Sequence, residues 1–186
     1  MAEIAIVESP AVATPLAEGN QDMGQMFMSF IDAADKEEAE TFLDLMAGLK
    51  SIWMAAKDLH YHAKGEPFYG LHLLADMVAD SEKFFDEIAE IYYLGERGEP
   101  PPDMREVFSR AVSENLNAKM AIEDAQKFGT ETDIYLKRLI AACGFVIGGV
   151  EKAKSITGNL SVTQAVLDEI SKTVLKDLGL LKRSVP

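Results

Sequence analysis

The sequence has little of several residue types, and each shortage excludes a class of protein. A single cysteine, Cys143, rules out an intrachain disulfide framework and fits a reducing interior, so we expect a cytoplasmic protein. The longest apolar run, residues 139–150, is too short to span a bilayer. The first 35 residues hold six acidic residues and no lysine or arginine, in a chain of net charge −13. The short apolar run argues against a membrane protein. Proteins that bind the phosphate backbone of DNA need basic patches, so we expect no DNA binding either.

What remains is the composition of one folded domain. With 186 residues, 48% of them hydrophobic, the chain can bury a core without disulfides. Residues 1–34, which include Pro10 and Pro15, predict a flexible or loosely docked acidic N-terminal arm. Residues 35–186 predict the folded domain.

Apolar residues recur at helical spacing through this domain, and no run alternates with the period of a strand. The first helix is predicted over residues 35–63, from a capping box at Asp35 to a turn at Gly65 and Pro67. The second, over residues 67–94, is expected to end at Gly95.

Three further helical segments follow, at residues 103–128, 132–157 and 161–186. A capping box from Ser161 to Gln164 is expected to open the last one. Gly144, Gly148 and Gly149 lower the helix propensity of the segment before it, which indicates a close helix approach or a bend there. The segment at residues 103–128 is long enough to let its two neighbours run parallel. The fold class is therefore all-α, with four long helices and a helical crossover.

Histidines and carboxylates gather in one segment. All three histidines, His60, His62 and His72, precede a series of acidic residues at helical spacing. With His72 at zero on a helical wheel, Asp76 lies at about 40°, Asp86 at about −40° and Glu90 at about 0°, so they share one stripe. His72 and Glu90 are about 27 Å apart along such a helix, so one ion cannot bind both within one chain.

Two-fold symmetry removes this obstacle. In an isologous dimer, His60, His72 and Asp76 of one chain would face Asp86 and Glu90 of the other, which makes two equivalent sites. The mixed nitrogen and oxygen donors suit Fe(II), Mn(II) or Zn(II). We expect His62 to face solvent.

The order of these residues resembles the DNA-protection-during-starvation (Dps) branch of the ferritin-like superfamily. The resemblance rests on His60, Lys64-Gly65, His72 twelve residues after His60, Asp76 four further on, and Asp86-Glu-Ile-Ala-Glu90 shortly before Leu94-Gly95. It implies a ferritin-like four-helix bundle, with a short helix in the crossover between the second and third long helices. It also implies a hollow dodecamer of two-fold dimers. The inter-subunit sites would be ferroxidase centres, where Fe(II) is oxidised by hydrogen peroxide or oxygen and stored as ferric mineral, which protects against peroxide damage.

The sequence departs from the family pattern in two places. Asp76 and Asp86 are ten residues apart, where the family usually has eleven. An ungapped match would use Glu87 instead, but would then place Ile91 where the second carboxylate belongs. Tyr61 also stands where the family usually has tryptophan. These departures leave a second hypothesis open, a ferritin-like structural or assembly protein whose metal site is decayed or holds another divalent metal.

Overall fold

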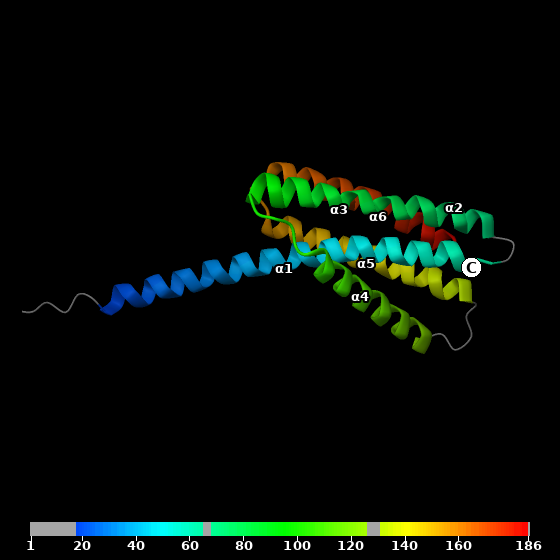
Figure 1. The fold of residues 1–186 in the computed structure, drawn as a ribbon, viewed down its shortest axis with the longest axis horizontal. Coiled ribbons are helices and arrows are strands. Elements are labelled where there is room, and N and C mark those ends of the chain that lie inside the picture. The colour runs from blue at the N-terminus through cyan, green and yellow to red at the C-terminus, as the bar shows by residue number, and fades with distance from the viewer. Residues whose placement is uncertain (1–17, 65–67, 126–130, 186) are drawn as a thin grey trace, which may run out of the picture. The chain divides into compact units, whose positions relative to one another are not determined.

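The chain folds into long helices joined by short connections (Figure 1). The computed structural model describes the backbone of residues 18–64, 68–125 and 131–185. In chain order, the elements are α1 (Glu18–His62), α2 (Phe68–Ala79), the 3₁₀ turn η1 (Asp80–Glu82), α3 (Lys83–Glu87), the π-helix η2 (Ile88–Arg97), α4 (Met104–Ala125), α5 (Glu131–Ile156) and α6 (Ser161–Arg183). No residue in these ranges belongs to a strand, so the all-α prediction is confirmed.

The first helix begins earlier than the sequence predicts. A start at Asp35 is wrong, because α1 begins at Glu18 and continues through that position. No proline lies between Pro15 and Asp35, so nothing in the backbone interrupts the helix there. The chain divides into the units Met1–Glu37 and Glu38–Pro186. The flexible arm stays a prediction, and its first 17 residues, like the turn expected at Gly65 and Pro67, lie outside the described residues.

Within the Glu38–Pro186 unit, the long helices form a bundle with one crossover. α2, η1, α3 and η2 follow one another directly and form one rod, called here the α2–η2 rod. This rod runs antiparallel to α1, and α6 runs antiparallel to α5 (Figure 1). Because α4 carries the chain back, the α2–η2 rod and α5 run parallel, as the sequence predicts. α6 packs against both α5 and this rod.

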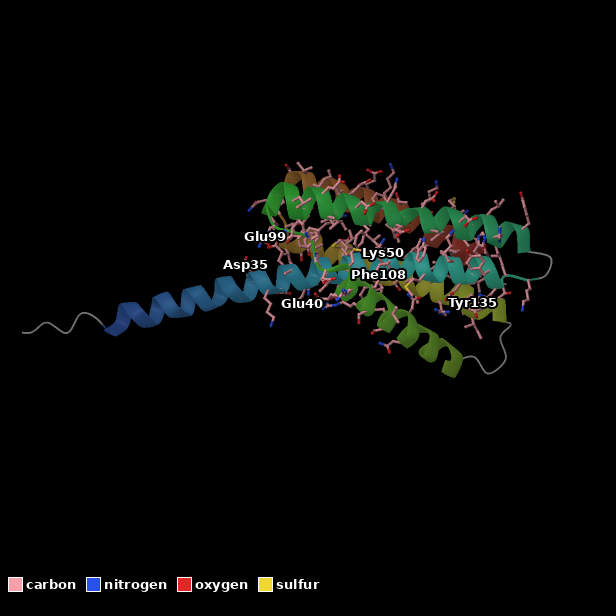
Figure 2. The ribbon with its side chains drawn as sticks, viewed as in Figure 1. Asp35, Glu40, Lys50, Glu99, Phe108 and Tyr135 are labelled. Carbon is pink, nitrogen blue, oxygen red and sulfur yellow. The ribbon has the colours of Figure 1, made fainter. Side chains whose placement is uncertain are left out.

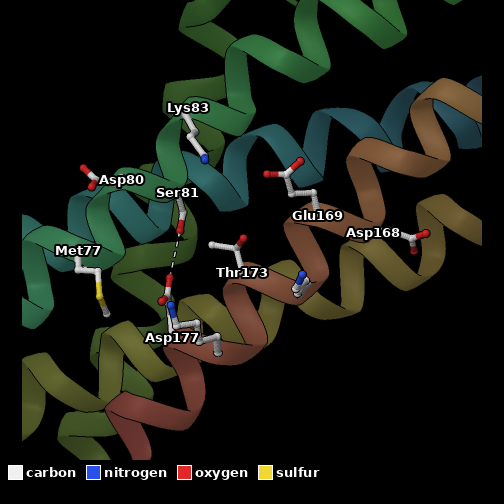
Figure 3. Close-up of a pocket in the computed structure, with 10 residues that line it drawn as sticks. Met77, Asp80, Ser81, Lys83, Asp168, Glu169, Thr173 and Asp177 are labelled. Carbon is white, nitrogen blue, oxygen red and sulfur yellow. Dashed lines mark hydrogen bonds between the residues drawn. The ribbon is translucent and has the colours of Figure 1, made fainter.

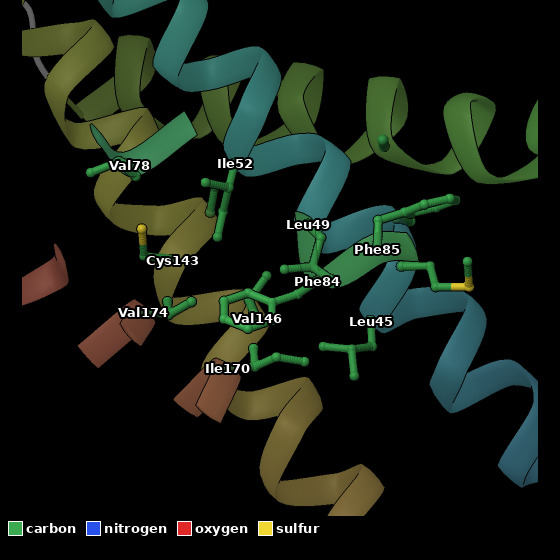
Figure 4. Close-up of a cluster of buried hydrophobic side chains, with 14 of the residues drawn as sticks. Leu45, Leu49, Ile52, Val78, Phe84, Phe85, Cys143, Val146, Ile170 and Val174 are labelled. Carbon is green, nitrogen blue, oxygen red and sulfur yellow. The ribbon is translucent and has the colours of Figure 1, made fainter. Parts of the chain in front are cut away.

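The apolar face predicted for the first long helix builds much of the core. Its fully buried members are Phe42, Leu45, Met46, Leu49, Ile52, Ala56 and Leu59. They belong to one cluster with Val78 and Phe84 of the rod, Val146 of α5 and Ile170 of α6 (Figure 4). Burying one such large side chain stabilises the fold by roughly 1.5–3 kcal/mol. The core therefore ties the His-bearing end of α1 to the rod that carries the carboxylates.

The close approach of α1 and α5 uses a different glycine from those expected. A Cβ atom on Gly48 of α1 would lie 2.9 Å from Cγ2 of Val146. At Gly144 and Gly148 of α5 a Cβ atom would meet no described atom within 4 Å, and at Gly149 it would make only an ordinary contact with Leu45 at 3.6 Å. The missing Cβ that this approach most requires therefore belongs to α1, and the bend predicted as the alternative reason for the α5 glycines stays a prediction.

Two predicted helix ends also differ from the structure. The α2–η2 rod continues through Gly95 to Arg97 and ends at Gly98, whose φ of 66° is the left-handed conformation that suits glycine. The capping box at Ser161 is wrong, because no side chain caps α6. Gln164 instead donates a hydrogen bond to Thr157 Oγ1, 2.9 Å away at the end of α5.

Polar contacts attach the crossover helix α4 to α1. Arg110 of α4 pairs with Glu40, 2.9 Å away, and with Asp44. One turn further on, Asn115 is buried and donates a hydrogen bond to Ser51 Oγ at 2.7 Å. Figure 2 shows Phe108 of α4 beside Lys50 of α1.

Glu114 makes the attachment of α4 pH-dependent. Its Oε2 is buried without a hydrogen bond, and burial, followed by the charge of Asp44, raises its pKa to about 7, against a lowering by Arg110. The native state therefore binds a proton between about pH 4.5 and 7 that the unfolded chain has lost, so the free energy of unfolding falls as pH rises through this window. Glu114→Gln should remove this dependence of stability on pH. The difference in free energy of unfolding between the variant and wild type should therefore be about 1–2 kcal/mol more favourable to the variant at pH 8 than at pH 5, allowing for screening.

Urea unfolding at the two pH values measures this difference. Glu106→Gln, a change at an exposed carboxylate of the same helix, serves as the control and should leave the slope as in wild type. Equal slopes for wild type and Glu114→Gln would contradict the assignment.

Candidate metal centre

Three residues predicted as metal ligands converge at one end of the bundle. His60 lies in the last turn of α1, and His72 and Asp76 lie in α2. One potential ligand atom from each lies within 4.8 Å of the other two. The two imidazole rings are 3.4 Å apart between centroids and tilted by 32°. Among the described residues, these three alone form such a group of histidine, cysteine or acidic side chains.

The backbone of α1 fixes the orientation of His72. Its Nδ1 lies 3.2 Å from the carbonyl oxygen of His60. A carbonyl only accepts, so Nδ1 carries the proton and donates it. In the neutral ring the lone pair is then on Nε2, the tautomer that metal-binding histidines commonly have when their other ring nitrogen donates to a carbonyl.

His60 brings a nitrogen that fits a cation better than it fits its protein neighbours. Its Nδ1 lies 2.9 Å from Asp76 Oδ1. This buried Nδ1 nevertheless makes no hydrogen bond within the described chain. A buried polar atom without a hydrogen bond costs free energy. A cation between the nitrogen and the carboxylate would satisfy both, so the residues present fit a divalent metal with mixed donors.

Sequence reasoning missed Lys57, which binds the third ligand. Its Nζ donates to Asp76 Oδ1 at 3.0 Å. This hydrogen bond is the largest of the causes that lower the pKa of Asp76, with smaller contributions from His60 and His72, while desolvation opposes them. Asp76 is therefore ionised at neutral pH. The signal was present in the sequence, because Lys57 precedes His60 by three residues and so shares its helix face.

Lys57 should compete with a metal ion for Asp76. Lys57→Met removes a positive charge beside the site, and we expect about three- to tenfold tighter Mn(II) binding, a modest gain because the pair is partly exposed and screened. Isothermal titration calorimetry measures the affinity. Lys172→Met, at an exposed position of α6, is the control. A gain no larger than that of the control would argue against competition.

The two remaining predicted ligands, Asp86 and Glu90, lie further along the rod. Both are exposed, Asp86 in α3 and Glu90 in η2. Ten residues separate Asp86 from Asp76, so it lies roughly 15 Å along the axis from the cluster. Within one chain, the structure does not bring these carboxylates to the histidines. Their role as ligands stays a prediction.

The surroundings of Asp86 and Glu87 differ. Asp86 lines an open pocket of about 360 Å³ that it shares with Trp53 and Lys57 of α1. Glu87 lines a small space with Tyr92 and with Thr163 of α6. Asp86 therefore shares a pocket with Lys57, the partner of Asp76, whereas Glu87 is directed toward α6. This geometry favours Asp86 over Glu87 as the carboxylate of the site.

The two unusual aromatic residues near His60 have different surroundings. Tyr61 is 73% exposed and meets the His60 ring edge-on at 5.0 Å between centroids. His62 is half-buried, stacks on Tyr135 of α5 at 4.4 Å, and has its Nδ1 2.8 Å from the carbonyl oxygen of Asp58. The expectation that His62 simply faces solvent is wrong, because it packs between α1 and α5.

Comparison with known proteins gives the fold. No protein-family model and no curated protein matches the sequence. Among solved structures, an archaeal Dps homologue from Halobacterium salinarum is similar over 83% of this chain and 82% of its own, with a TM-score of 0.63 and 17% identity. Dps from Thermosynechococcus elongatus is similar over 83% of this chain and 93% of its own, with a TM-score of 0.64 and 18% identity. The chain thus has the ferritin-like fold of Dps proteins, as the sequence predicts.

The hydrophobicity of the helices bears on membrane spanning within the described residues. No helix there combines enough length with enough hydrophobicity to cross a bilayer.

Proposed function

We propose that this protein is a Dps-like mini-ferritin that binds and oxidises Fe(II) at sites shared between subunits and stores the ferric product. The observation that carries the proposal is the convergence of His60, His72 and Asp76 at the α1–α2 end of the bundle. Two imidazoles and a carboxylate are a donor set suited to Fe(II). The Dps-type fold supports the proposal independently.

The three-ligand cluster is half of a site, so a second copy must complete it. Asp76 is partly exposed in this chain, and Asp86 and Glu90 are exposed further along the same rod. In a two-fold dimer with antiparallel rods, the carboxylate end of one chain meets the histidine end of the other. Each dimer then has two complete sites. We propose that such dimers assemble further, as a dodecamer.

Iron is the substrate at this site. His60 and His72 bind Fe(II) through neutral nitrogens, and the carboxylates offset the added charge of the ferric product. In the overall reaction, two Fe(II) ions each lose one electron, and hydrogen peroxide takes up both electrons and two protons to give two water molecules. Oxidising iron in pairs avoids the one-electron step that releases hydroxyl radical, so the reaction protects against peroxide. The ferric ions then move to the mineral store.

One observation favours the alternative function. The Lys57 ammonium already neutralises Asp76, as expected of a bundle that needs no metal. Such a protein would be a structural or assembly component with a decayed site, or one that holds another divalent metal. Anomalous scattering at the iron and zinc edges of crystals soaked in each metal separates these cases, because a decayed site would bind neither.

Fe(II) oxidation tests the main proposal directly. Purified protein mixed with Fe(II) and hydrogen peroxide should show fast growth of ultraviolet absorbance, and light scattering should give a mass near twelve subunits. His60→Ala combined with Asp76→Ala should slow oxidation to the buffer rate. His62→Phe is the matched control, because it removes a neighbouring imidazole and keeps a ring stacked on Tyr135. Equal rates for wild type and the double variant would end the proposal.

A further inference from the structure

The α2–η2 rod changes its winding between the two halves of the proposed site. His72 and Asp76 lie in α2, and Asp86 lies in α3. Between them, the three residues of η1 form a 3₁₀ turn. Such a turn advances about 120° and 2.0 Å per residue, against about 100° and 1.5 Å in an α-helix. The turn therefore rotates everything that follows it.

This rotation brings Asp86 back toward the stripe of Asp76. In an uninterrupted α-helix, ten residues would leave Asp86 about 80° away from Asp76 around the axis. Three overwound residues reduce that gap to about 20° and add about 1.5 Å of rise, so ten residues span the length of eleven. A π-helix winds less tightly than an α-helix, so Glu90 in η2 stays within about 40° of Asp86.

Buried polar contacts hold the turn from two sides. Ser81 is 1% exposed, and its Oγ donates to Oδ2 of Asp177 in α6 at 3.4 Å (Figure 3). On the other side, Glu82 pairs with the buried Lys50 of α1. The Lys50 ammonium also lies 4.3 Å from the ring centroid of Phe85. The overwound residues are thus attached to α6 and to α1 at once.

These anchors are difficult to explain as sources of stability alone. Asp177 is 4% exposed and the side chain of Lys50 is 9% exposed. Desolvating such groups costs about as much free energy as their pairing returns, so apolar residues would hold the helices together equally well. Polar pairs have defined geometry, however, and can hold one specific winding where apolar packing would accept several.

We propose that η1 is a register-setting turn, and that Lys50 and Asp177 are positioning residues that keep it overwound so that Asp86 lies within about 20° of Asp76 on the stripe of His72, Asp76 and Glu90. The inference rests on the proposed function, because the stripe matters only if these residues form a metal site. The turn stands in for one missing residue.

Inserting that residue is the test. One alanine between Ser81 and Glu82 lets the rod become a plain α-helix of the same length, in which Asp86 again lies about 20° from Asp76, on the other side of it. We expect Mn(II) affinity within about threefold of wild type, with the same electron paramagnetic resonance spectrum of bound Mn(II). The same alanine inserted between Asp86 and Glu87 rotates Glu90 by about 100° and should weaken binding about 10- to 100-fold. Equal losses from the two insertions would overturn the inference.

Lys50→Met separates positioning from general stability. At the native length it should weaken Mn(II) binding about tenfold and change the spectrum of the bound ion. In the chain with alanine after Ser81 it should have no effect, because a regular helix needs no anchor. A loss of the same size at both lengths would show a merely structural lysine and overturn its positioning role.

The outcomes keep the two proposals apart. If wild type binds no Mn(II), the proposed function fails. Thermal melting of the two insertion variants then still decides the role of η1, because only an insertion that replaces the overwound turn keeps the core in register.

Discussion

Mixed particles built from His72→Ala and Glu90→Ala subunits are expected to recover Fe(II) oxidation that neither variant shows alone. If each site takes its histidines from one chain and its outer carboxylates from the other, a mixed dimer contains one site with both mutations and one with neither. Random pairing makes about half of the dimers mixed, so about a quarter of the sites are intact. Recovery to about one quarter of the wild-type rate therefore follows from symmetry alone.

Co-expression of the two variants with different affinity tags, and sequential purification, isolates the mixed particles for a stopped-flow oxidation assay. The matched control mixes His60→Ala with His72→Ala subunits. Both mutations then fall on the histidine half of the site, so no pairing restores an intact one. Recovery in both mixtures, or in neither, would contradict a site shared across a two-fold axis.

The helices themselves could be predicted from the sequence because their apolar periodicity is local. Phe42, Leu45 and Leu49 recur on one face, and all three are fully buried. The ends of the helices were harder to predict than the helices themselves. Asp35 followed by Lys-Glu-Glu matches a capping box, yet α1 passes through it, because a cap motif can also form ordinary helix when no proline or turn precedes it.

The winding of the α2–η2 rod could not be predicted, because its cause is distant in sequence. A wheel drawn at 100° per residue assumes uniform winding. Ser81 is held by Asp177, which lies 96 residues away. The residues next to Ser81 in sequence do not predict that contact. From the sequence alone, the ten-residue spacing between Asp76 and Asp86 is therefore only a departure from the Dps pattern. In the structure, the same spacing spans the length of an eleven-residue helix.

For the candidate metal site too, the residues brought together by local sequence could be predicted, and those that depend on other contacts could not. His60, His72 and Asp76 could be predicted together, because a short connection between α1 and α2 places them at one end of the bundle. Lys57 does not follow from a ligand pattern, because an ammonium group cannot bind a metal ion and acts here only by pairing with Asp76. Asp86 and Glu90 can join the site only across a contact between copies, so their role stays a prediction that the mixed-particle experiment addresses.

Phe42→Ala is expected to cause the largest loss of stability, and it should also loosen the carboxylate half of the site. Phe42 is fully buried and stacks on Tyr92 of η2, with centroids 3.5 Å apart and rings 7° from parallel. Removing a buried phenylalanine costs about 3–5 kcal/mol, because a cavity remains. Burial, and then the hydrogen bond that its hydroxyl donates to Glu38 at 2.8 Å, raise the pKa of Tyr92. This tyrosine therefore stays neutral when Phe42 is removed.

At about 2–4 °C per kcal/mol, this cost corresponds to a fall of about 6–20 °C in the midpoint of thermal unfolding. Leu175→Ala, at a half-exposed position of α6, is the control and should change stability by less than about 0.5 kcal/mol. Because Tyr92 lies two residues after Glu90 on η2, Mn(II) affinity of the folded variant should fall as well. If Phe42→Ala were as stable as the control, packing of Phe42 on Tyr92 would not stabilise η2. The proposal that the core positions Glu90 through this contact would then be wrong.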